Sequence, residues 1–167
     1  MKLRFLLASL FIVLLDQATK WYMQWTLAPG QSMPVVRGVL HFTLSFNSGI
    51  AFGLFPQWGH LFLWMSLTVV ALVLVFYLRM GSPSSLTTAI ASLLVGGALG
   101  NVVDRLRLGH VVDFIDFRVF PVFNVADTAV TCATILFIAR TWLVVREPEH
   151  QPILKKNRRE PAGPPAE

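Results

Sequence analysis

Long apolar runs separated by short polar segments are the dominant pattern along this chain. Two of these runs, residues 61–78 and 86–103, contain no Asp, Glu, Lys or Arg. An apolar run of about 18 residues or more is long enough to cross the hydrocarbon core of a bilayer as a helix. The pattern therefore predicts an all-α membrane protein with four transmembrane helices, over about residues 4–27, 61–78, 86–103 and 125–145.

The first apolar run, residues 3–15, starts beside the basic residues Lys2 and Arg4 and so resembles the start of a cleaved secretory signal. A cleavage site needs small residues after the apolar stretch, whereas Asp16, Lys20 and Trp21 follow here. The helical pattern then continues until Pro29. We therefore predict that this segment is retained as the first transmembrane helix.

The segment between the first two helices contains a strand-like pattern. Apolar and polar side chains alternate over residues 40–46, which is the two-residue period of a β-strand. Residues 47–49 follow with the composition of a turn. We therefore predict a small β-sheet cradle in this loop, which covers residues 28–60.

Composition and charge place the chain in a membrane and give it an orientation. Of its 167 residues, 54% are hydrophobic and 14% charged, against roughly 25% charged in an ordinary soluble domain. Lysines and arginines cluster near both ends, as in cytoplasmic segments of membrane proteins. Both termini are therefore expected in the cytoplasm, with loops 28–60 and 104–124 on the outer face. Three arginines in the second loop oppose this assignment, but the terminal clusters are larger.

Domain organisation follows from the same pattern. Residues 1–146 are expected to form one transmembrane domain. Residues 147–167 are rich in proline and charge, which is typical of a disordered segment, and we expect a basic cytoplasmic tail near the lipid headgroups.

The third predicted helix contains Gly96, Gly97 and Gly100. Small residues at such spacing allow the backbone of a neighbouring helix to approach closely. This helix is therefore expected to pack tightly against its neighbours or to leave room for a substrate.

Several polar residues occur where a membrane makes them costly, at roughly 2.5–3.5 kcal/mol for a charge. Asp16 and Lys20 are four residues apart and share one helix face, so they either neutralise each other or serve a function. Asn101 and Arg105 have the same spacing, with Asp104 between them. We expect these residues to form a structural polar network.

Asp113 and Asp127 are the candidate catalytic pair. Asp113 lies in the second outer loop and Asp127 opens the fourth helix, so both are expected near the outer interface. Two carboxylates in a partly dry site share a proton, which lets one activate water while the other polarises a carbonyl. Asn124 lies one helical turn before Asp127, in position to hold either carboxylate or a substrate carbonyl. The simpler alternative for Asp127 is a charge that favours a helix N-terminus.

Other functions find less support in the sequence. The four histidines match no zinc spacing, and His110 with Asp113 is the only seed of a metal site, so no metal and no cofactor are expected. The single Cys132 excludes an intramolecular disulfide. No phosphate-binding loop is present, and the basic tail suits a membrane surface better than nucleic acid. A small transporter with charges staggered across the bilayer, or a scaffold that tolerates Asn at both aspartates, remain the alternatives.

Five segments in order resemble the family of lipoprotein signal peptidases, also called signal peptidase II, over about residues 5–145. They are Asp16–Lys20, Asn47–Gly53, Gly96–Arg105, Gly109–Phe114 and Phe123–Asp127. The resemblance implies a four-helix aspartic endopeptidase of the bacterial inner membrane. Its substrates are prolipoproteins that carry a diacylglyceryl group on a cysteine, and it cuts just before that cysteine.

The resemblance also implies roles for individual residues. Asp113 and Asp127 become the catalytic dyad, and Asp16, Lys20 and Asp104 become structural polar residues. A further set of polar or small residues binds substrate or supports the dyad: Asn47, Gly49, Asn101, Arg105 and Asn124. Inhibition by the cyclic peptide globomycin is implied as well. Because four helices can enclose such a site, we expect a monomer whose partners are the prolipoprotein and membrane lipids.

Overall fold

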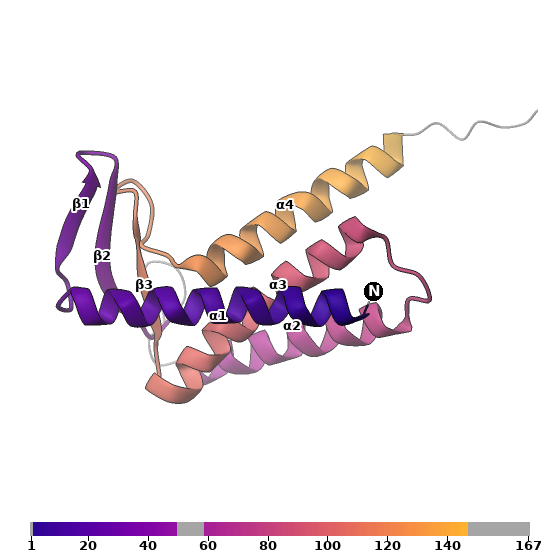
Figure 1. Cartoon of the computed structure of the whole chain (residues 1–167), viewed down its shortest axis with the longest axis horizontal. Helices are drawn as coiled ribbons and strands as arrows, with labels where there is room; N and C mark the ends of the chain where they lie inside the picture. The colour runs from indigo at the N-terminus through magenta and orange to yellow at the C-terminus, as the bar shows by residue number, and fades with distance from the viewer. Residues whose placement is uncertain (1, 50–58, 147–167) are drawn as a thin grey trace, which may run out of the picture.

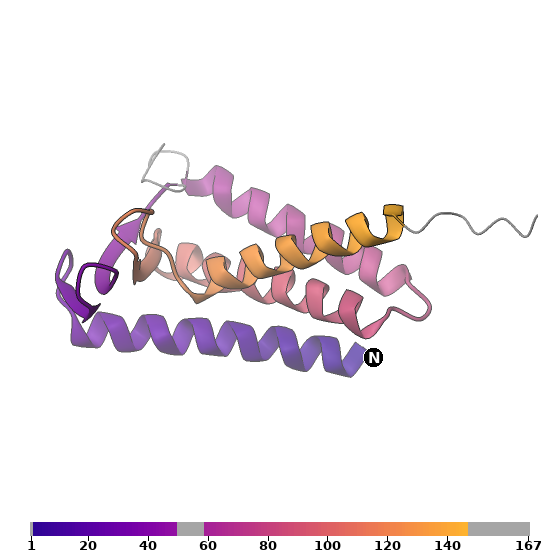
Figure 2. The same cartoon turned by 90° about the horizontal axis from the view of Figure 1, so that it is seen from above.

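The computed structural model describes residues 2–49 and 59–146, which form a bundle of four helices with a small sheet at one end (Figure 1). The predicted tail and residues 50–58 of the first outer loop lie outside the described residues. The helices are α1 Lys2–Thr26, α2 Gly59–Arg79, α3 Ser85–Leu108 and α4 Val125–Arg146. α3 is the central helix, because it packs against each of the other three (Figure 2).

The sheet has three antiparallel strands in the order β1-β2-β3: β1 Ser32–Val36, β2 Leu40–Asn47 and β3 Val111–Asp116. The predicted strand at residues 40–46 is confirmed as β2. The sequence prediction placed the whole cradle in the first outer loop, and this was wrong, because β3 comes from the second. The sheet therefore joins the two loops, with Ser45 opposite Asp113.

α3 continues to Leu108, five residues beyond its predicted end, so Asp104 and Arg105 are helical and not part of a loop. The charged side chains near its end made this segment resemble a polar loop. The helix ends at Gly109, whose positive φ of 78° is the left-handed conformation that favours glycine at a helix C-terminus. The Gly109 N–H donates to the carbonyl oxygen of Arg105.

Large apolar side chains cover the outside of the bundle. Among the described residues, three helices are long and apolar enough to cross a membrane: His60–Arg79, Ser85–Leu108 and Val125–Leu143. The start of α1 and the end of α4 lie at the same end of the bundle, opposite the sheet (Figures 1 and 2). α1 is not one of these three helices, so its crossing of the membrane, and with it the total of four spans, stays a prediction.

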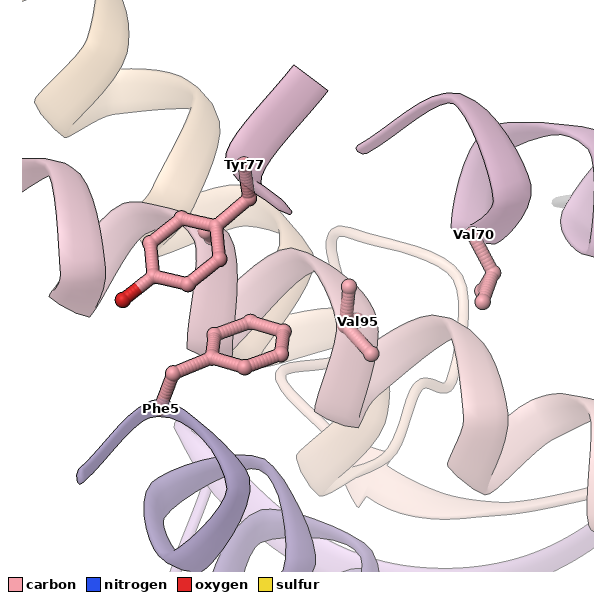
Figure 3. Close-up of a cluster of buried hydrophobic side chains, with 5 residues drawn as sticks. Phe5, Val70, Tyr77 and Val95 are labelled. Carbon is pink, nitrogen blue, oxygen red and sulfur yellow. The ribbon is translucent and has the colours of Figure 1, made fainter. Parts of the chain in front are cut away.

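An aromatic cluster joins α1, α2 and α3 at the end far from the sheet (Figure 3). The rings of Phe5 and Tyr77 stack with centroids 4.3 Å apart, and Val95 packs beside them. Because lipid tails are as apolar as these side chains, helices in a membrane associate through close packing and polar contacts more than through the hydrophobic effect. The Tyr77 hydroxyl adds one such contact, to Thr88 Oγ1 at 3.2 Å.

Gly96 and Gly97 form a seam, along which the backbone of α3 lies directly against the backbones of α1 and α4. A Cβ atom added to Gly96 would lie 2.9 Å from the carbonyl oxygen of Ser9 in α1. One added to Gly97 would lie 2.6 Å from the carbonyl oxygen of Ala126 in α4. The seam is therefore used for helix packing, and it fixes how far α1 and α4 stand from α3.

We predict that Gly97→Ala destabilises the protein by about 1–3 kcal/mol, because an added methyl group forces α4 away from α3. Gly81→Ala is the matched control, since a Cβ added there has no neighbour within 4 Å. Denaturant unfolding in detergent micelles measures both. Equal free energies of unfolding for the two variants would contradict the close packing of α3 against α4 at Gly97.

Candidate active site

A buried ion cluster underlies the site, at the sheet end of α1 and α3. The Lys20 ammonium lies 2.8 Å from Asp16 Oδ2 and 2.8 Å from Asp104 Oδ2. It donates its third hydrogen bond to Asn101 Oδ1 at 2.9 Å. All three N–H donors of an ammonium group are thus used, and the three charged side chains are at most 4% exposed. The predicted pair of Asp16 and Lys20 is therefore part of a larger network.

The two carboxylates of this cluster also hold the backbone on which the candidate dyad stands. Asp16 Oδ1 accepts a hydrogen bond from the backbone N–H of Ala126, the residue before Asp127, at 2.9 Å. Asp104 Oδ2 accepts one from the N–H of Val112, the residue before Asp113, at 3.1 Å. The cluster therefore fixes the start of α4 and the start of β3 relative to α1 and α3.

Asn124 and Asp127 cap the N-terminus of α4 reciprocally. The Asp127 N–H donates to Asn124 Oδ1 at 2.9 Å, and the Asn124 N–H donates to Asp127 Oδ2 at 3.3 Å. This is a capping box with Asp in the place of the usual Glu. The other oxygen, Asp127 Oδ1, accepts from Asn101 Nδ2 at 2.8 Å. Asp127 therefore caps α4 with one carboxylate oxygen, while the other oxygen faces Asn101.

Asp113 is 2% exposed on β3 and accepts from two asparagine amides. Asn124 Nδ2 donates to its Oδ1 at 2.6 Å, and Asn47 Nδ2 donates to its Oδ2 at 3.1 Å. The Asn47 oxygen accepts from the Gly49 N–H at 3.0 Å, which fixes the direction of the amide. Asn124 thus contacts both aspartates.

The surroundings of Asp113 oppose its ionisation. Burial, followed by the negative charge of Asp127, raises the pKa of Asp113 to about 7. The amides of Asn47 and Asn124 and the charge of Lys20 act in the opposite direction but are outweighed. Asp113 therefore gains and loses a proton near neutral pH.

Both aspartates line one pocket of about 300 Å³ under the sheet. Its polar lining comes from predicted residues and Thr131, and its apolar lining comes from Val111 and the segment between β3 and α4. The lining residues are Asn47, Gly49, Asn101, Arg105, Val111, Asp113, Phe120, Pro121, Val122, Phe123, Asp127 and Thr131. Six of the seven residues predicted to form or support the dyad thus line this pocket, and the seventh, Asn124, contacts both aspartates.

A second, more apolar pocket of about 390 Å³ opens between α2, α3 and α4. It shares Asn101, Arg105, Asp127 and Thr131 with the first pocket. Its apolar walls include Phe62, Met65, Val69, Leu94, Ala98 and Val130. An extended apolar ligand in this groove would therefore end beside Asp127.

Sequence reasoning missed several residues of the site. Gln17 Nε2 donates to Asp104 Oδ1 at 2.8 Å and completes the ion cluster, although its only sequence signal was its place between Asp16 and Lys20. Phe120 and Thr131 carried no signal, because apolar and hydroxyl residues are common in such segments.

Within the described ranges no group of three or more His, Cys, Asp or Glu residues is placed to hold a metal ion. His110 instead packs against the ring of Phe46, with centroids 4.6 Å apart.

Known proteins resemble this chain in both sequence and fold. A solved bacterial membrane enzyme superposes with a TM-score of 0.82 and 30% identity, over 90% of this chain and 94% of the other. The lipoprotein signal peptidase of Halothermothrix orenii is 38% identical over 133 residues, which cover 80% of this chain and 91% of the relative. That of Pelotomaculum thermopropionicum is 41% identical over 125 residues, which cover 75% of this chain and 82% of the relative.

The family model described as signal peptidase II matches residues 8–143. This range contains the ion cluster, both aspartates and every asparagine that contacts them. Matches of this extent to sequence and structure together establish that the chain belongs to the lipoprotein signal peptidases, the signal peptidase II family.

Proposed function

We propose that this chain is an aspartic endopeptidase that cuts diacylglyceryl-modified prolipoproteins just before the lipidated cysteine. Its family consists of bacterial membrane proteases that remove signal peptides from lipoproteins. The observation that carries the finer proposal is the common pocket of Asp113 and Asp127, in which asparagine amides hold both carboxylates.

In the proposed reaction Asp127 is the general base and Asp113 the general acid. Asp127 lies in the first turn of α4, where the helix N-terminus favours a negative charge. The amide of Asn101, held by the cation Lys20, donates to it as well. Asp113 has its pKa raised to about 7 and supplies the proton. In this proposal Asp113 is the aspartate that carries the proton in the resting enzyme.

The proposed reaction has two steps, formation and collapse of a tetrahedral diol, and both aspartates transfer a proton in each step. Asp127 removes a proton from a water molecule, whose oxygen attacks the scissile carbonyl carbon, while Asp113 donates its proton to the carbonyl oxygen. The resulting tetrahedral diol collapses when Asp127 gives its proton to the leaving nitrogen and Asp113 takes back a diol proton. Both carboxyl groups thus return to their starting states, and no metal or cofactor takes part.

The remaining residues around the pocket are proposed to bind substrate. Arg105 is half-buried where the two pockets meet, so its guanidinium group suits a peptide carbonyl next to the cleavage point. Gly49 lines the pocket with backbone alone and leaves room for the substrate chain. The apolar groove between α2, α3 and α4 is proposed to hold acyl chains and signal helix. Globomycin is proposed to occupy the same site.

The proposed setting is the bacterial inner membrane, which α1 crosses as a fourth span. The common end of the α1 start and the α4 end would face the cytoplasm, which places the sheet and the aspartates at the outer face. A substrate anchored by its lipid then meets the aspartates without leaving the bilayer. We propose that a monomer suffices, because one chain supplies every residue of the site.

Asp113→Asn and Asp127→Asn are each expected to lower the cleavage rate by at least about 10²–10⁴-fold, because each removes one proton-transfer group. The measurement is turnover of a diacylglyceryl-modified prolipoprotein peptide in liposomes. Asp116→Asn is the matched control, since Asp116 lies on the same strand but bonds to Thr43 and Arg118. It is expected to retain activity within a few fold. Wild-type rates in both dyad variants would refute the mechanism.

The pH dependence of cleavage is expected to follow Asp113. The reaction needs its protonated form, so kcat/KM should fall as the pH rises above about 7. Asn47→Ala removes a donor that favours the ionised form, and therefore moves this decline to higher pH. Thr43→Ala serves as the control, because its hydroxyl contacts Asp116. An unmoved or downward-shifted profile in Asn47→Ala would argue against Asp113 as the acid.

Lys20→Met is expected to cost about 3–5 kcal/mol of stability, because two buried carboxylates lose their cation. Cleavage should fall as well, since the Asn101 amide loses the contact that directs it to Asp127. Arg118→Met is the comparison: the Arg118 side chain is 51% exposed in its ion pair, and its loss should cost less than about 1 kcal/mol. Unfolding and turnover in detergent test both effects, and equal losses would show that the buried cluster holds nothing in place.

A further inference from the structure

A third pocket lies between α1 and the end of α3, two helices that run side by side (Figure 2). Its volume is about 300 Å³, and it shares no lining residue with the two pockets at the aspartates. The lining residues are Gln17, Lys20, Trp21, Gln24, Trp25, Asp104, Arg107 and Leu108. The proposed peptidase reaction does not use this pocket.

Arg107 gives the pocket a positive charge that forms no ion pair with any of the described carboxylates. Its one hydrogen bond goes to Gln17 Oε1 at 3.3 Å, and within the described part of the chain no carboxylate lies within 4.0 Å of its guanidinium nitrogens. A guanidinium group has five N–H donors in a planar fork, so most of them remain available. Such a fork matches the oxygens of a phosphate group.

Asp104, the one acidic residue among those lining the pocket, is paired with Lys20 and not with Arg107. Both oxygens of Asp104 are occupied, Oδ1 by Gln17 and Oδ2 by Lys20 and the Val112 N–H. The Lys20 ammonium is likewise saturated. An anion entering the pocket therefore meets the free donors of Arg107 as its principal partner.

Two tryptophans place the rim of this pocket at the level of lipid headgroups. Trp21 and Trp25 are four residues apart on one face of α1 and are 68% and 77% exposed. Exposed tryptophans are enriched where a membrane meets water, because the indole combines an apolar ring with one N–H donor. Below them, the exposed Leu14 and Leu10 continue the apolar surface of α1 toward the middle of the bundle.

We propose that this pocket binds the headgroup of a membrane phospholipid, with the phosphate on Arg107 and the acyl chains along α1. The pocket volume of about 300 Å³ leaves room for a phosphate group and its glycerol, since a water molecule takes about 30 Å³. A bound lipid would cover polar groups in the pocket between α1 and α3, next to the ion cluster. The proposal is independent of the peptidase mechanism, since it concerns a different pocket and a ligand that is not cleaved.

The test is lipid binding to the full-length protein in detergent, followed by native mass spectrometry with two lipids that have identical acyl chains. Phosphatidylglycerol carries the phosphate, and diacylglycerol lacks it. Arg107→Gln is expected to weaken phosphatidylglycerol binding about tenfold, the loss of one charge-assisted contact, and to leave diacylglycerol binding unchanged. Unchanged diacylglycerol binding and an unchanged unfolding midpoint show that the variant is folded.

Arg37→Gln is the matched control, because Arg37 is an exposed arginine in the turn between β1 and β2 and loses the same charge. It should leave the binding of both lipids unchanged. Equal effects of the two substitutions would overturn the proposal in favour of a general attraction to charge. Displacement of phosphatidylglycerol by millimolar inorganic phosphate would overturn it in favour of free phosphate. No effect of Arg107→Gln on either lipid would overturn it as well.

Discussion

The contact between the Lys20 ammonium and its three partners is the interaction on which the rest of the structure depends. A lone charge at this depth would be costly, and here it is matched by two carboxylates and an amide. Each carboxylate then uses a second contact to hold the backbone next to one aspartate of the candidate dyad. Four elements of the fold, α1, α3, β3 and α4, are thus brought into register by one buried cation.

The same arrangement directs the amide groups around the pocket. An asparagine side chain presents an acceptor on one side and donors on the other, so fixing its oxygen decides where its NH₂ group points. Lys20 fixes Asn101, the Asp127 N–H fixes Asn124, and the Gly49 N–H fixes Asn47. In all three cases the NH₂ group is left facing a carboxylate. The dipoles of the pocket are therefore oriented before any substrate arrives, which is the form of electrostatic preorganisation that catalysis uses.

The sequence predicts the helices well, because apolar runs of this length have few alternatives to a membrane helix. It misplaces the end of α3, since Asp104 and Arg105 resemble loop residues until the buried Lys20 is seen beside them. It misses β3, because strand pairing between two loops depends on contacts distant in the chain. The types and order of Asp113 and Asp127 are sufficient to nominate a dyad, whereas the amide directions and the Arg107 pocket depend on three-dimensional geometry.

The glycine seam also bears on a hazard that any protein with buried charges in a membrane faces, which is leakage of protons and ions. A continuous file of water beside Asp16, Lys20 and Asp104 would offer such a route. One helical turn away from the cluster, however, α3 meets α1 at Gly96 and α4 at Gly97 so closely that not even a methyl group fits between the backbones. At that depth, therefore, no file of water fits between the backbone of α3 and those of α1 and α4.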